Sequence, residues 1–227
     1  TDCLTEATAG TFTNAMAHAT ADGDVVTLLP GTGGIYDFTV FTPYAKTAVV
    51  NVSTKSYFVG NKAITVRSKA ENPATVALVG GGAGVDGRAF CFGAAATIKG
   101  LTLSNFYTSG SAAAVYSTKR DLVVSNCAII GNRANSNYGA LYQLKAADCE
   151  FDGNFSKKNA GVGASLDLVR CTLIRNGAAG DSYGSTGASV QNSTADGCTF
   201  QTSYMTTYFG SGLMISGSTL TNCVFRN

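Results

Sequence analysis

The stretch Asp148-Cys149-Glu150-Phe151-Asp152-Gly153-Asn154 (DCEFDGN) decides the fold of this chain of 227 residues, because versions of it recur along the sequence. The recurrences are NCAIIGN from Asn126, RCTLIRN from Arg170, GCTFQTS from Gly197 and NCVFRN from Asn222. Their cysteines follow one another at intervals of 22, 22, 27 and 25 residues. A period in the twenties that drifts by insertion indicates a solenoid.

A second set of segments, each led by a glycine, precedes the cysteines. They are GALYQL from Gly139, GASLDL from Gly163, GASVQN from Gly187 and GLMISG from Gly212. Short runs rich in Val, Ile, Leu, Phe and Thr, with no helical period, favour strands. We therefore expect coils of a parallel β-solenoid, in which each strand pairs with its counterpart one coil away at about 4.8 Å.

The side-chain period of two separates an inner face from an outer face in each repeat. Cys149 and Phe151 share one face, which we expect to point inward. We predict one inward ladder formed by Cys127, Cys149, Cys171, Cys198 and Cys223, with Asn132, Asn154 and Asn176 stacked inside the turns. Stacked amides would satisfy polar groups that are otherwise buried unpaired. No metal site is expected at the cysteines, because zinc ligands come as close pairs and no two of these lie nearer than 22 residues.

The same period places Asp148, Glu150 and Asp152 together on the outer face of one predicted strand. Such a row is the candidate for a cation or sugar contact, because calcium prefers carboxylate oxygens. Arg170 occupies the position next to Asp148 one coil on, so a neutralising ion pair is the simpler expectation. We expect no catalytic residue and no cofactor. His18, the single histidine, is expected to be solvated.

The first part of the chain predicts a cap. Phe12, Ala15, Met16 and Ala19 recur at helical spacing, and Gly23 ends the pattern. VVTLL, residues 25–29, is the first expected strand. We therefore predict a single domain of residues 1–227, with a cap over 1–23 and coils over 24–227. The helix would cover the strand edge at that end of the solenoid.

The opening GDVVTLLPGT, with ITVRS and IKGLTLSN further on, resembles the start of right-handed parallel β-helix proteins of the pectin-lyase-like superfamily. The later coils resemble repeats of polymorphic outer membrane proteins, bacterial surface adhesins with paired GGA-[ILV] and F-x-x-N motifs. GAL at Gly139 followed by FDGN at Phe151 is the best match, although Tyr138 stands where the first glycine of the motif is expected. The resemblance implies an all-β right-handed parallel β-helix. It leaves function open, because the superfamily holds enzymes, adhesins and structural shafts.

Composition limits the classes of binding partner and the cellular compartment that we expect. Charged residues are 13% and the net charge is +2, so we expect no nucleic-acid partner. No apolar run approaches the length of a membrane span. Asn51 and Asn192 head sequons and are candidate glycosylation sites, whereas the sequon at Asn154 coincides with the inner ladder. The low charge and the resemblance both favour an extracellular or cell-surface location.

We accordingly expect a non-enzymatic extracellular structural or adhesive protein, a rigid solenoid. The alternative is a carbohydrate-active enzyme or carbohydrate-binding module, with Tyr138, Tyr183 and Tyr208 as sugar-stacking platforms. The sequence stops at NCVFRN in the middle of an expected coil. Its Phe225, Arg226 and Asn227 are the candidate interface, either for head-to-tail self-association into filaments or for the remainder of a longer precursor. Surface glycans are the other candidate partners.

Overall fold

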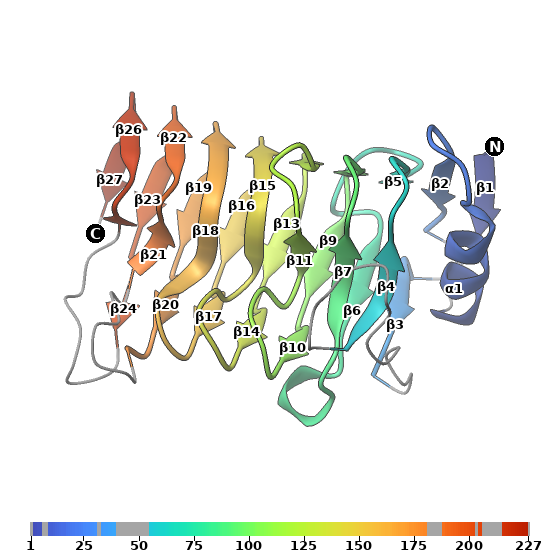
Figure 1. The fold of residues 1–227 in the computed structure, drawn as a ribbon, viewed down its shortest axis with the longest axis horizontal. Helices are drawn as coiled ribbons and strands as arrows, with labels where there is room; N and C mark the ends of the chain where they lie inside the picture. Colours follow the sequence, from blue (N-terminus) through green and yellow to red (C-terminus); the bar gives the residue numbers. More distant parts are fainter. Residues whose placement is uncertain are drawn as a thin grey trace.

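The computed structural model describes residues 2–5, 9–30, 33–39, 55–180, 188–202, 204–205 and 215–226. Over these residues the chain winds into a parallel β-solenoid with one α-helix, as predicted (Figure 1). The strands form sheets of fourteen, eight and five members, and every paired strand runs parallel to its neighbour. The all-β parallel prediction is therefore confirmed.

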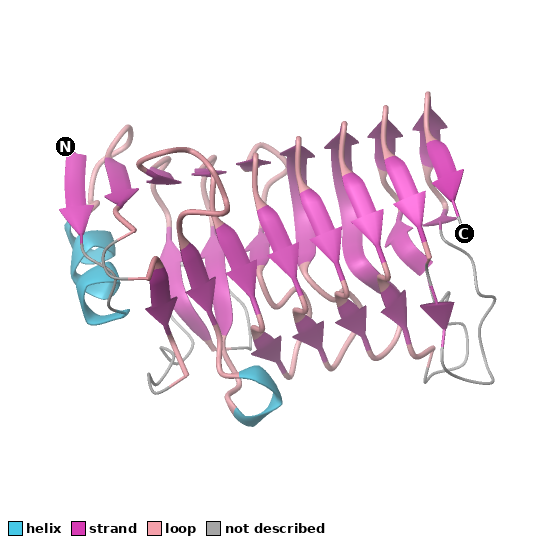
Figure 2. Ribbon diagram, turned by 180° about the vertical axis from the view of Figure 1, so that it is seen from behind, coloured by secondary structure: helices cyan, strands magenta, loops and turns pink. Residues whose placement is uncertain are grey.

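The chain rises through the fourteen-stranded sheet on the near side of Figure 1 and descends through the eight-stranded sheet on the near side of Figure 2. Because the coils advance from right to left in Figure 1, the solenoid is right-handed. This is the hand expected for crossovers between parallel strands. The five-stranded sheet runs along the lower edge and completes each of the later coils.

The three sheets are made of short strands with the following bounds. The fourteen-stranded sheet contains β1 (Asp2–Thr5), β2 (Val25–Leu28), β4 (Ser56–Gly60), β5 (Thr65–Ser68), β7 (Arg88–Phe92), β8 (Thr97–Lys99), β11 (Val115–Ser117), β12 (Val123–Ser125), β15 (Leu141–Ala147), β18 (Ala160–Val169), β21 (Ala188–Gln191), β22 (Thr194–Asp196), β25 (Ile215–Ser216) and β26 (Thr219–Thr221). The eight-stranded sheet contains β3 (Ile35–Asp37), β6 (Ala77–Val79), β9 (Thr102–Ser104), β13 (Ala128–Ile130), β16 (Glu150–Asp152), β19 (Thr172–Ile174), β23 (Thr199–Gln201) and β27 (Val224–Arg226). The five-stranded sheet contains β10 (Tyr107–Thr108), β14 (Arg133–Ala134), β17 (Phe155–Ser156), β20 (Gly177–Ala178) and β24 (Tyr204–Met205).

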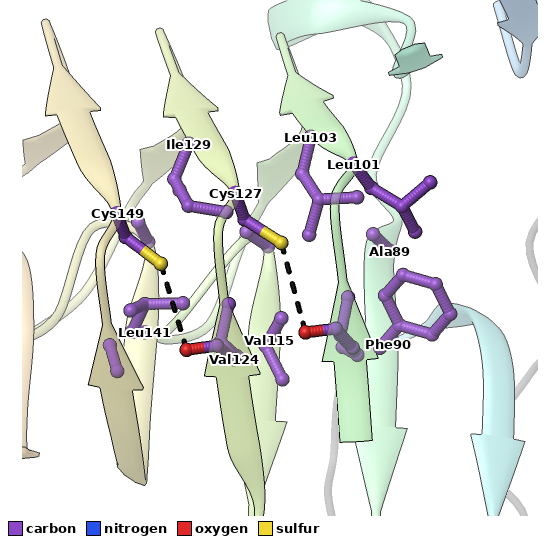
Figure 3. Close-up of a cluster of buried hydrophobic side chains, with 14 of the residues drawn as sticks. Ala89, Phe90, Leu101, Leu103, Val115, Val124, Cys127, Ile129, Leu141 and Cys149 are labelled. Carbon is purple, nitrogen blue, oxygen red and sulfur yellow. Dashed lines mark hydrogen bonds between the residues drawn. The ribbon is translucent and has the colours of Figure 1, made fainter. Parts of the chain in front are cut away.

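The register confirms the repeat alignment. Phe151 pairs with Ile129 on one side and Leu173 on the other, and the column continues to Phe200 and Phe225. Backbone bonds link each cysteine to the next coil, because the amide that follows one ladder cysteine donates to the carbonyl of the previous one, as in Glu150 to Cys127 at 2.9 Å. The cysteine side chains point inward (Figure 3). Leu101 takes the cysteine position one coil earlier and is fully buried.

Two of the glycines that lead the predicted segments, Gly139 and Gly163, lie where backbones approach closely, while Gly187 and Gly212 lie outside the described residues. A Cβ on Gly139 would lie 1.9 Å from the carbonyl oxygen of Gly161, and one on Gly163 would lie 2.2 Å from that of Leu141. Neither distance leaves room for a methyl group, so the packing of neighbouring backbones requires glycine at both positions.

The N-terminal end carries the predicted helix and an additional strand. Helix α1 (Ala9–His18) begins and ends earlier than the predicted 12–19, and Phe12, Ala15 and Met16 are buried in the core as expected. The ring of Phe12 meets Phe38 edge-on at 5.3 Å. The predicted cap over 1–23 also contains β1, which pairs in parallel with β2. The sheet therefore begins within the segment that the sequence had assigned to the cap alone.

Candidate functional site

The acidic row predicted on one outer strand is divided between a strand and a turn. Glu150 and Asp152 lie in β16, whereas Asp148 precedes that strand in a left-handed turn with φ of 55°. The prediction that all three project from one strand is therefore wrong. The corner between two sheets falls at Asp148, and the chain turns there through a conformation that Asp and Asn tolerate better than most residues.

Two of the three carboxylates are held by arginines of the next coil. Arg170 donates from Nε and Nη2 to the two carboxylate oxygens of Asp148, both at 2.7 Å. Arg175 donates in the same two-pronged way to Asp152, with Nε at 2.8 Å from Oδ1. The bonds from Arg170 hold the pKa of Asp148 below its usual value. The neutralising pair expected at Asp148 is confirmed, and Asp152 has a second such pair that the repeat alignment did not reveal.

This arrangement suits structural contacts better than chemistry. Glu150 is exposed and adds a smaller effect to that of Asp152 in raising the pKa of Arg175. Within the described parts of the chain, no group of three or more His, Cys, Asp or Glu side chains is placed to hold a metal ion. A carboxylate that already accepts both prongs of an arginine has little capacity left for calcium.

The asparagine ladder is built as predicted. Asn132, Asn154 and Asn176 are fully buried. Asn154 accepts at Oδ1 from the backbone and side-chain nitrogens of Asn132, at 3.0 and 3.1 Å. Its own Nδ2 donates to the carbonyl of Ile129 at 2.7 Å and to Asn176 Oδ1 at 3.0 Å. Phe106 precedes the ladder, and its backbone amide donates to Asn132 Oδ1 at 3.0 Å.

The cysteine ladder is a column of unpaired thiols. Cys127, Cys149, Cys171 and Cys198 are at most 3% exposed, whereas Cys223 in the last described coil is only partly buried. Cys149 donates to the carbonyl of Val124 in the preceding coil at 3.6 Å, a contact drawn in Figure 3. The hydrogen bond with Cys149, followed by burial, raises the pKa of Cys171 to about 12. Since metals and electrophiles react with the thiolate, a raised pKa makes Cys171 act as a small apolar residue. At Cys127 burial acts to raise the pKa, but hydrogen bonds with Cys149 and with backbone groups lower it overall.

Sequence reasoning missed a second cluster, which lies around a buried arginine. Arg88 is 1% exposed and donates from Nε to the carbonyl of Ala112 at 2.6 Å and from Nη2 to that of Ser111 at 2.5 Å. Its guanidinium lies 4.7 Å from the ring centre of Tyr116. Cys91, a fully buried free thiol, also contacts Arg88, and its burial raises its pKa.

Tyr138, the described member of the predicted sugar platform, belongs to a stack of tyrosines. Its ring lies parallel to that of Tyr142 at 5.0 Å, and Tyr142 lies 5.1 Å from Tyr116. Ring faces are therefore occupied by other rings, which favours packing over sugar stacking at Tyr142. The recurrence of AVY at Tyr116 and ALY at Tyr142 is the sequence signal that could have revealed the stack. Tyr183 and Tyr208 lie outside the described residues.

The remaining candidate residues lie at corners and in the last strand. Asn192 is exposed in a left-handed turn between β21 and β22. Phe225 in β27 is 49% exposed and stacks on Phe200 at 5.1 Å, while Arg226 is exposed. Asn51 and Asn227 lie outside the described residues.

No protein-family model matches the chain, and no curated protein matches it. The fold and the contacts above therefore carry the functional argument. None of the described helices is long and apolar enough to cross a membrane.

Proposed function

We propose that the chain is a rigid, non-catalytic β-solenoid that serves outside the cell or at its surface as a structural or adhesive element. This proposal rests on one observation: polar side chains of one coil bond to those of the next. Inside, the amides of Asn132, Asn154 and Asn176 bond one another, and outside, Asp148 and Asp152 are each held by an arginine. These groups tie successive coils together, which is what a stiff rod requires.

The test of the non-catalytic role uses the acids of the outer row. Purified protein is incubated with neutral and acidic polysaccharides, and new reducing ends or unsaturated products are measured. We expect no turnover above that of buffer. Turnover that disappears in Glu150→Gln, while the change of another exposed acid, Asp121→Asn, leaves it unchanged, would contradict the proposal. Glu150 is chosen because its replacement breaks neither arginine pair.

A carbohydrate-binding module is the second candidate, and the tyrosine stack is the observation that favours it. Tyr116, Tyr138 and Tyr142 are partly exposed on the outer side of the fourteen-stranded sheet. Aromatic rings bind sugars through their faces, and Tyr138 lies at one end of the described stack, whereas Tyr142 lies between two other rings. Titration with neutral oligosaccharides, followed by tyrosine fluorescence, distinguishes this candidate, and Tyr138→Leu would abolish the signal if the stack binds sugar. A spectrum that stays constant throughout the titration leaves the structural role as the better account.

We further propose that β27 is an assembly surface for the N-terminal region of a second copy. Phe225 and Val224 are 49% and 46% exposed, and β26 and β27 stand at the ends of their sheet paths among the described strands. An exposed strand edge with apolar side chains is a template for pairing, and contact between unlike ends would propagate as a filament.

Sedimentation of the native chain over a range of concentrations tests this assembly. We expect oligomers that Phe225→Asp and deletion of residues 226–227 abolish. Ile130→Asp, which places the same charge on an outward position of β13 in the middle of the solenoid, is the matched control. A native chain that stays monomeric at high concentration would rule out self-association and favour the longer-precursor alternative.

The proposed extracellular location is tested by glycosylation at Asn192. Expression through a eukaryotic secretory pathway should add a glycan there, because the side chain is exposed at a corner. Asn154 should remain unmodified in the folded protein, since its amide is buried and bonded on both sides. Peptide mass mapping of the secreted protein decides between the two sites.

A further inference from the structure

The last two thiols of the described cysteine ladder, Cys198 and Cys223, lie in adjacent coils. Val224 in β27 pairs with Thr199 in β23, and its amide donates to the carbonyl of Cys198 at 2.8 Å. This register places the two cysteines, which directly precede those residues, side by side. Neighbouring rungs lie about 4.8 Å apart, and disulfide-bonded cysteines have Cα atoms about 4.4 to 6.8 Å apart. The backbone therefore already has a spacing that suits a disulfide.

The sulfur of Cys223 leans toward the coil that holds Cys198. It donates to the carbonyl of Ala195, in β22 of that coil, at 3.5 Å and to the carbonyl of Thr221 at 3.2 Å. Cys223 is partly exposed, whereas the other four ladder thiols are at most 3% exposed. Because thiol reactivity requires access, a dissolved reagent reaches the ladder first at Cys223.

Cys198 is held differently from the other ladder thiols. Each of the others donates to a carbonyl of the preceding coil, as Cys171 does to Ala146 at 3.5 Å. Among the described contacts Cys198 has no such bond. Its sulfur donates to the carbonyl of Asp196, two residues earlier, at 3.4 Å and accepts from the amide of Cys171 at 3.3 Å. Rotation of this side chain to another staggered position therefore gives up only weak bonds of sulfur.

We propose that Cys198 and Cys223 form a disulfide bond when the chain meets a small disulfide such as oxidised glutathione. The thiolate of Cys223 attacks one sulfur of the reagent, and one glutathione leaves as its thiolate. The thiol of Cys198 then loses its proton to solvent and attacks the sulfur of Cys223, which releases the second glutathione. Two protein thiols are thus oxidised to one disulfide, and the reagent is reduced to two thiols.

The bond would tie the last described coil covalently to the one before it. That coil carries Val224 and Phe225 of the proposed assembly surface. A cross-link restricts the open states of a strand without changing its pairing, so β27 should be held more firmly in the oxidised chain. The inference rests on the proposed extracellular location only for the supply of the oxidant, because small disulfides persist in oxidising compartments.

The proposal is tested by incubating the full chain with oxidised glutathione, alkylating the remaining thiols in denaturant and mapping the peptides by mass. The buffer is mildly alkaline, because a hydrogen bond with Cys171, followed by burial, raises the pKa of Cys198. We expect a linked pair of peptides that contain Cys198 and Cys223, lighter by two hydrogens than the reduced pair and absent after treatment with dithiothreitol. Cys198→Ser should instead leave glutathione on Cys223, because no second thiol releases it.

Cys149→Ser is the matched control, since it removes a buried ladder thiol two coils before Cys198 and should leave the linked peptides unchanged. A circular dichroism spectrum shows that each variant is folded. Hydrogen exchange provides the second measurement: after oxidation the amides of β27 should exchange about tenfold more slowly, while those of β13 keep their rates. Unchanged exchange at β27 would show that the bond does not fasten the coil.

Three results would overturn the proposal. They are the absence of the linked peptides from the native chain, glutathione that stays on Cys223 while Cys198 is present, and a cross-link between Cys149 and Cys171 that forms equally fast. None of these results touches the non-catalytic rod, because turnover and assembly are measured separately. Linked peptides in a chain that sediments as a monomer would likewise support the disulfide while ruling out the self-association.

Discussion

The inner asparagine ladder and the outer arginine–aspartate pairs join the same coils by very different means. Asn154 is fully buried and takes part in bonds to Asn132, Ile129 and Asn176. The Asp148 and Arg170 side chains are 50% and 63% exposed. Water can replace the outer bonds when they break, but nothing replaces the inner ones. Similar polar contacts therefore contribute unequally, and burial decides the difference.

The largest effect is expected from Asn154→Ala. The change leaves the amide of Asn132 and the carbonyl of Ile129 buried without their side-chain partner, so we expect a loss of about 3 to 4 kcal/mol in the free energy of unfolding. Urea denaturation followed by circular dichroism measures it. The exposed Asn135→Ala should change stability by less than about 0.5 kcal/mol. Comparable losses in the two variants would remove the distinction between buried and exposed amides.

An intermediate effect is expected from Cys149→Ser, which tests whether the ladder thiols act as apolar residues. The substitution places a hydroxyl in an apolar column, at a cost of about 1 to 3 kcal/mol in unfolding free energy. Cys223→Ser should cost less, because that side chain is only partly buried. Denaturation midpoints of the two variants provide the comparison. A larger loss at Cys223 would show that burial does not govern the column.

The smallest effect is expected from Asp148→Asn, which removes the outer pair. The stability change should be smaller than in either inner variant and should shrink further in high salt, because exposed ion pairs are screened. Thermal melts at low and high ionic strength measure both effects. A salt-independent loss as large as that of Asn154→Ala would show that the exposed pair contributes as much to stability as the buried ladder.

The pH dependence of the same pair has a defined sign. The folded-state pKa of Asp148 lies below its usual value of 3.8, because Arg170 bonds the charged form. The stabilisation is therefore complete above that value and is lost as pH falls through the lower folded-state pKa. Melting temperatures of the native chain and of Asp148→Asn should converge in strong acid. A gap that widens on acidification would show that the pair has the opposite effect.

Much of the fold could be predicted because similar residues recur at similar intervals along the sequence. The inward positions of Cys149 and Phe151 follow from strand alternation, and the burial of Asn154 follows from its place in each turn. The site was harder to predict. Arg175 lies in a turn with φ of 51° and donates to Asp152. The alternation of side chains holds only in extended strands, so it could not predict the direction of this side chain. Arg88 could not be predicted to be buried, since its partners are carbonyls of another coil.

The sequence by itself determined the period, the inner columns and the helix that covers one end, because these depend on local spacing and on which residues avoid water. Only the tertiary structure decided which charges meet, where the corners fall and that β1 joins the sheet ahead of the helix. Those features depend on contacts between residues about one coil or more apart. A side chain such as Arg133 has the same sequence signal whether it meets a carboxylate or an aromatic ring. The neighbouring coil makes that choice, and here it supplies Phe155.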